Sequence, residues 1–120
     1  MPVRRIVLAA LPGLLLFSAQ ASAHAILVSS EPAAGASVPG GKIAMSLRYN
    51  SRIDRDRSRI VLVKPDHSQS VLPIGHEGTP DLLQTSVDLT VPGAYVVRWQ
   101  VLATDGHITR GDVAFTVTGP

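Results

Sequence analysis

The stretch Ala94–Leu102 alternates apolar side chains with a period of two. Successive side chains of an extended strand point to opposite faces, so Tyr95, Val97, Trp99 and Val101 share one face. No segment after residue 23 shows the period of a helix. The chain is therefore expected to fold from strands that each bury one face. The same alternation is found at Lys42–Tyr49, Thr85–Val91 and Asp112–Thr118.

Glycine and proline separate these segments at short intervals, as at Pro39-Gly40-Gly41 and Pro92-Gly93. Such spacing predicts an all-β fold, a β-sandwich of about seven strands. The charge-alternating Arg52–Arg57 is expected to be a solvated edge or loop, and Leu72–Leu83 a long loop. Shorter strands are expected at Ala25–Ser29, Arg59–Lys64 and Val71–Ile74.

The first 23 residues have the pattern of a secretory signal peptide. Arg4 and Arg5 precede the apolar run Ile6–Ala19, and Ala21-Ser22-Ala23 has the small residues of a cleavage site. The run is shorter than the roughly 20 residues of a membrane-spanning helix. We expect cleavage after Ala23, export to the periplasm, and one domain over residues 24–120.

Charge and cysteine content exclude several function classes. Arg4 and Arg5 belong to the leader, so 9 of the 11 basic residues remain and balance the 9 acidic ones. A neutral domain is not expected to bind nucleic acid. The absence of Cys excludes disulfides, thiolate zinc sites and iron–sulfur clusters.

Cleavage at the expected place makes His24 the N-terminal residue. Its α-amine, with an ordinary pKa of about 7.7–8.0, and its imidazole could then chelate one metal ion. An amine with an imidazole suits copper(II) best and nickel(II) second. The alternative is that the signal peptidase leaves this His by chance.

A second candidate feature is Asp105-Gly106-His107, between the strongest strand and the last one. A Gly permits a sharp turn that presents a carboxylate and an imidazole together. The alternative is a polar turn with a surface His, since Asp-Gly is a common hairpin turn. With His24, the set becomes an amine, two imidazoles and a carboxylate, which suits one copper(II) ion.

The remaining ligand types carry less weight. His67 and His76 are expected to be exposed turn residues, and Trp99 and Phe115 core residues. Met45 is the one Met after residue 23 and lies on an apolar strand face. Since a copper(I) thioether site needs several Met residues, none is expected here.

The stretch His24–Gly35, together with Asp105-Gly106-His107, Gly111 and Phe115, resembles the CopC copper-resistance family. The resemblance implies a periplasmic, immunoglobulin-like Greek-key sandwich that binds copper(II) through His24, Asp105 and His107. It also implies a possible separate membrane transporter of the CopD type as partner. We expect a monomer without the Met-rich copper(I) site that some members carry.

Three functions remain open at this stage. The leading one is a copper(II) carrier or buffer in copper homeostasis and resistance, without enzymatic activity. The second is a copper-dependent oxidase or monooxygenase built on an N-terminal histidine brace, which would need an open coordination position. The third is a metal-free immunoglobulin-like interaction domain, and tight copper binding would rule it out.

Overall fold

The structure, a computed structural model, describes residues 24–119 and is all-β. The signal peptide expected over residues 1–23 lies outside the described residues. Among residues 24–119, no helix is long and apolar enough to cross a membrane. The strands are β1 (Leu27–Glu31), β2 (Ser37–Pro39), β3 (Gly41–Tyr49), β4 (Ile53–Val63), β5 (Gln69–Leu72), β6 (Leu82–Leu89), β7 (Gly93–Ala103) and β8 (Ile108–Thr118).

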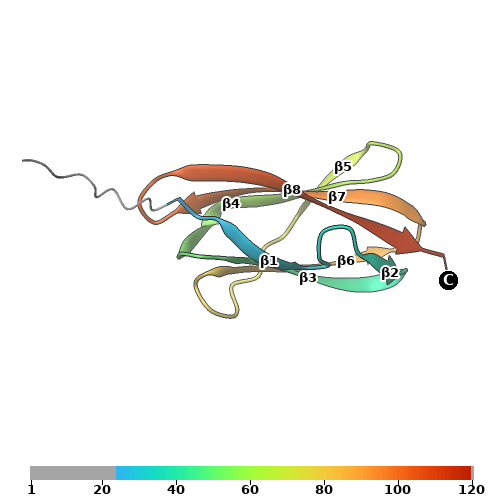
Figure 1. The fold of residues 1–120 in the computed structure, drawn as a ribbon, viewed down its shortest axis with the longest axis horizontal. Coiled ribbons are helices and arrows are strands. Elements are labelled where there is room, and N and C mark those ends of the chain that lie inside the picture. Colours follow the sequence, from blue (N-terminus) through green and yellow to red (C-terminus); the bar gives the residue numbers. More distant parts are fainter. Residues whose placement is uncertain (1–23, 120) are drawn as a thin grey trace, which may run out of the picture.

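The strands form two sheets that pack face to face (Figure 1). One sheet has the order β1-β3-β6 and the other the order β2-β8-β7-β4-β5. Short β2 pairs in parallel with the end of β8, and every other pair is antiparallel. The predicted β-sandwich is confirmed, with eight strands where about seven were expected.

Three of the four alternating segments bury the faces that the sequence predicts, whereas in Thr85–Val91 Leu89 is buried and Val91 is exposed. Tyr95, Val97, Trp99 and Val101 of β7 are all buried, and so is Phe115 of β8. No polar or charged residue is buried between residues 24 and 119. The interior of the sandwich is therefore built from apolar residues, and its buried polar atoms include the Tyr49 hydroxyl and the Trp99 indole nitrogen.

One register position shows how tightly this interior is packed. Trp99 of β7 lies opposite Gly111 of β8. A Cβ atom at Gly111 would collide with Cζ2 and Cε2 of the indole. Glycine is thus required at this position by the size of the neighbouring ring.

The charged segment Arg52–Arg57 lies at a solvated edge of the sheet, as expected, because β4 pairs with β5 only from Ile60 onward. Most of this segment is the first half of β4, where the pairing with β7 is interrupted between Asp54 and Arg59. Such a bulge leaves extra residues outside the ladder, and polar ones are tolerated there. Ser58 bridges the interruption, because its hydroxyl donates to the Asp54 carbonyl at 2.6 Å and accepts from the Leu102 amide at 3.2 Å.

Candidate metal centre

The hairpin between β7 and β8 presents the Asp105-Gly106-His107 motif. Two backbone hydrogen bonds close it: Gly106 N donates to Ala103 O, and Ala103 N donates to His107 O, each at 2.9 Å. Gly106 has a φ of 93°, a backbone conformation that residues other than glycine rarely adopt. The motif is therefore a tight turn, as its Gly predicts.

Within this turn, the carboxylate of Asp105 contacts His107 twice. Its Oδ1 accepts from the His107 backbone N–H at 3.1 Å, and its Oδ2 lies 2.6 Å from Nδ1 of the ring. The backbone hydrogen bond, followed by the ring contact, lowers the pKa of Asp105 below its ordinary value. Asp105 is therefore an anionic oxygen donor that also orients the imidazole of His107.

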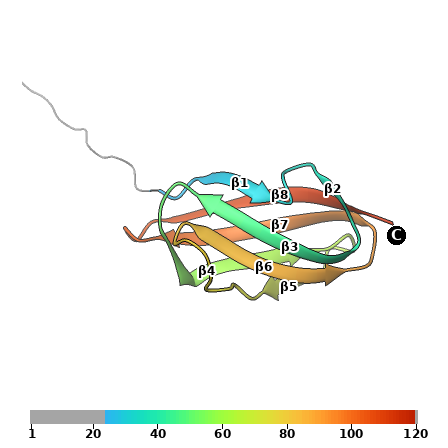
Figure 2. The same ribbon diagram turned by 90° about the horizontal axis from the view of Figure 1, so that it is seen from below.

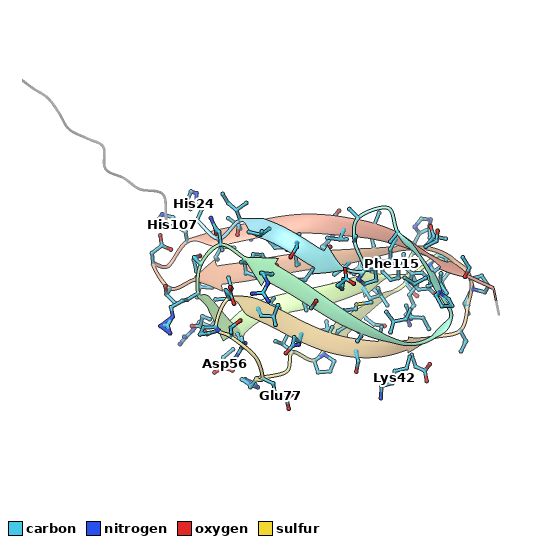
Figure 3. The ribbon with its side chains drawn as sticks, turned by 60° about the horizontal axis from the view of Figure 1, so that its bottom comes forward. His24, Lys42, Asp56, Glu77, His107 and Phe115 are labelled. Atoms are coloured by element: carbon cyan, nitrogen blue, oxygen red, sulfur yellow. The ribbon has the colours of Figure 1, made fainter. Side chains whose placement is uncertain are left out.

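His24, the first residue that the structure describes, lies beside this hairpin although it is far from it in the sequence. Its ring centroid lies 4.6 Å from that of His107, with the rings at 77°. Figure 3 shows the two labelled side chains next to each other at one end of the sandwich. The fold thus brings both predicted imidazoles to one place.

The segment after His24 is tied to both sheets. The Ala25 carbonyl accepts from the Thr109 hydroxyl of β8 at 2.8 Å. Ile26 N donates to Asn50 Oδ1 at 2.8 Å, and Asn50 N donates back to Ile26 O at 3.0 Å. Sequence reasoning missed Thr109 and Asn50 as positioning residues, because contacts across such separations leave no local pattern.

The described chain holds no preformed metal cage. Between residues 24 and 119, no three His, Asp or Glu side chains are grouped so that they could hold an ion. The nitrogen of His24, the further donor that the sequence predicts, is a peptide amide wherever Ala23 precedes it.

The other histidines lie elsewhere. His67 is an exposed turn residue with a φ of 70°. His76 is exposed as well, and its Nε2 lies 2.9 Å from Asp56 Oδ1. The predictions for both are confirmed, as is the burial of Met45 in the core.

Comparisons with known proteins decide the family. A family model described as CopC domain matches residues 27–118. The chain belongs to the CopC family. It is 31% identical over 98 residues to protein YobA of Escherichia coli K12, covering 79% of each chain.

Solved structures of the family have the same fold. The crystal structure of CopC from Methylosinus trichosporium OB3b matches with a TM-score of 0.71 and 28% identity, over 80% of this chain and 95% of that one. PcoC of Escherichia coli, a methionine-rich copper resistance protein, matches with a TM-score of 0.65 and 23% identity, over 80% and 100% of the two chains. The latter likeness is one of fold alone.

Proposed function

We propose that this protein is a periplasmic copper(II)-binding protein that carries or buffers the ion in copper homeostasis. One ion binds to the α-amine and imidazole of His24, to His107 and to Asp105. Membership of the CopC family supports copper as the cargo. The amine becomes available when the leader is cleaved after Ala23.

The observation that carries the proposal is the 4.6 Å separation of the His24 and His107 rings. Had the rings lain at opposite ends of the sandwich, the predicted ligand set would have been impossible. Both rings are exposed, so an ion can enter from solvent. Nitrogen donors of this kind favour copper(II) over the other common divalent ions.

The contact between Asp105 and His107 fits the same reading. Two ligand atoms at about 2.0 Å from a metal, a typical metal–nitrogen distance, are about 2.8 Å apart when they bind at a right angle. Asp105 Oδ2 and His107 Nδ1 are 2.6 Å apart. A metal ion that replaced the proton between them could therefore take both atoms as neighbouring ligands.

A carrier fits the chain better than an oxygen-activating enzyme. An anionic fourth ligand stabilises copper(II) and fills the position that oxygen would need. The aromatic residues of the described chain, Tyr49, Tyr95, Trp99 and Phe115, are buried, so none of them offers a platform for a polymeric substrate. With Met45 as the sole, buried methionine of residues 24–119, the proposal includes no thioether site for copper(I).

The test is a copper(II) titration against a strong chelator on two forms of the domain. One form begins at His24, and the other carries one extra residue before it. We expect the first to bind one ion tightly and the second to bind much more weakly, because the extension converts the amine to an amide. Equal, weak binding by both forms would overturn the proposal.

A repeat of the titration in mild acid adds an independent check. Protons compete for the amine and the imidazoles, so the affinity of the His24 form should fall with pH. An affinity that does not change between neutral and mildly acidic solution would contradict these ligands.

A further inference from the structure

The outer face of the five-stranded sheet carries arginines from three neighbouring strands. Ile60 of β4 and Trp99 of β7 point into the core, so the residues on either side of them point outward. Across the strands, Arg59 pairs with Gln100, and Gln100 pairs with Arg110. Two guanidinium groups thus flank one amide side chain in a single row. Figure 1 shows β4, β7 and β8 together in the upper layer.

The neighbouring row differs because its charge is balanced. Val61 pairs with Arg98, and Arg98 pairs with Asp112. The Arg98 guanidinium donates to both Asp112 oxygens, at 3.1 and 3.4 Å. The Asp112 carboxylate of this neighbouring row is therefore already paired with Arg98.

The Arg59 row, in contrast, has an excess of positive charge and of N–H donors. Arg110 Nε donates to Gln100 Oε1 at 2.8 Å, which leaves the terminal nitrogens of Arg110 available. Since its oxygen accepts that bond, the Gln100 amide presents its NH₂ group. Within residues 24–119, the Arg59 guanidinium has neither a hydrogen bond nor an ion pair.

A hollow of about 180 Å³ lies over this row, lined by Arg59, Val61, Arg98, Trp99, Gln100 and Arg110. A water molecule takes about 30 Å³ of liquid, so the hollow has room for a small oxyanion, and since most of its wall is hydrocarbon, the polar contacts must come from the guanidinium and amide groups. Neighbouring strands are about 4.8 Å apart, which places the Cα atoms of Arg59 and Arg110 about 10 Å apart. Two arginine side chains at this spacing can close on one ion between them.

We propose that Arg59, Gln100 and Arg110 form a binding site for a phosphate-type oxyanion on the outer face of the five-stranded sheet. Each guanidinium can give a forked pair of hydrogen bonds to two oxygens of the ion, and the Gln100 NH₂ can donate to a third. The ion would offset the unbalanced charge of the row. The site is independent of copper, because neither predicted imidazole lines the hollow.

The test is a titration of the metal-free protein with inorganic phosphate at constant ionic strength, followed by NMR. We expect saturable shifts of the Gln100 side-chain NH₂ and of the Arg59 and Arg110 Nε–H signals. In R59Q/R110Q, the phosphate affinity should fall at least about tenfold, while the core amide signals and the copper affinity stay unchanged.

Two further variants separate a built site from general attraction. R52Q removes the charge of an exposed arginine that does not line the hollow, and it should leave phosphate binding intact. R59K keeps the charge but loses the fork, so it should weaken binding. Phosphate binding that is weakened in R52Q as much as in R59Q/R110Q would overturn the proposal.

Vesicles identify the source of the phosphate group. They are prepared from phosphatidylcholine alone or with added phosphatidylglycerol. If the protein binds the vesicles with phosphatidylglycerol but not those of phosphatidylcholine, and R59Q/R110Q does not bind them, the ligand is a lipid headgroup. Binding of free phosphate without vesicle binding would make it a soluble ion. If neither free phosphate nor vesicles bind, the site does not exist.

Discussion

Two Asp–His pairs on this molecule look alike but have different surroundings. In one, Asp105 Oδ2 lies 2.6 Å from His107 Nδ1, and in the other, Asp56 Oδ1 lies 2.9 Å from His76 Nε2. All four residues are exposed. Only the first pair has a second imidazole beside it, that of His24. Figure 3 shows Asp56 well away from the two labelled histidines.

The loops that carry the two histidines are also held differently. The hairpin at residues 103–107 is closed by its own backbone hydrogen bonds. The loop at residues 73–81 is held by Arg55, whose guanidinium donates to the carbonyls of His76, Glu77, Gly78, Thr79 and Leu82. The two pairs thus differ in how their loops are held and in the second imidazole, from a distant segment, that only the Asp105–His107 pair has beside it.

The largest expected difference between the pairs is in copper affinity. H107A removes one proposed ligand and should lower the copper(II) affinity by more than about a hundredfold, since loss of an outer hydrogen-bond partner alone costs about 10–100-fold. H76A should change it less than about twofold. Chelator competition on forms that begin at His24 measures both. Equal losses in the two variants would remove the distinction.

The next effect concerns the Arg55 contacts. R55Q leaves several loop carbonyls without their charged donor and should lower the free energy of unfolding by about 1–3 kcal/mol. Hydrogen exchange in residues 73–81 should become faster, while copper affinity stays the same. Denaturant unfolding measures the stability.

Arg57 provides the control for this substitution. Among the described residues, its guanidinium bonds only Asp54, at 2.8 Å, and its side chain is 73% exposed. R57Q should therefore cost less than about 1 kcal/mol, as exposed ion pairs do. If R55Q and R57Q were equally stable, the carbonyl contacts of Arg55 would not be what holds the loop.

The comparison also explains what the sequence could predict. Alternation showed the buried faces of β3, β7 and β8, because a strand with one buried face leaves a period-two signal. The Asp105–His107 turn was predictable because both residues and their glycine lie within one short segment. β2, with three residues, is too short to show a period.

Other features were hidden because they depend on contacts between distant residues. Strand β4 continues through Asp54–Arg57 by means of a bulge, although charged residues in such a run are typical of a loop. The carbonyls bonded to Arg55 lie 21 to 27 residues away from it. The tie between Thr109 and Ala25 spans 84 residues. That His24 and His107 meet was therefore a hypothesis that only a three-dimensional structure could examine.

A smaller effect distinguishes the turns themselves. G106A puts a Cβ on a residue whose φ is 93°. No other atom lies within 4 Å of that Cβ. The substitution should therefore lower the free energy of unfolding only through backbone strain, by about 1 kcal/mol. G75A is the matched change in the other loop. There the Cβ would meet Gln84 O at 3.6 Å, an ordinary contact, so the cost should be under about 0.5 kcal/mol. Denaturant unfolding of both variants measures the difference, and equal costs would contradict strain at Gly106.

The smallest expected effect concerns the proton of Asp105. Its pKa lies below the ordinary value first because the His107 backbone N–H donates to it, and second because of the His107 ring. A lowered folded-state pKa stabilises the fold above the unfolded-state pKa, and this contribution is lost as pH falls through the folded-state value. H107A keeps the backbone donor, so the pKa of Asp105 should rise only part of the way.

Asp66 provides the contrast, because the Ser68 hydroxyl is the largest cause of its lowered pKa and the Ser68 backbone N–H the second. S68A should therefore return the pKa of Asp66 further toward its ordinary value than H107A returns that of Asp105. Carboxyl carbon NMR of the metal-free protein between neutral pH and about pH 2, well below the ordinary Asp pKa, measures both. A complete return for Asp105 in H107A would mean that the ring, and not the backbone of the turn, keeps this carboxylate ionised.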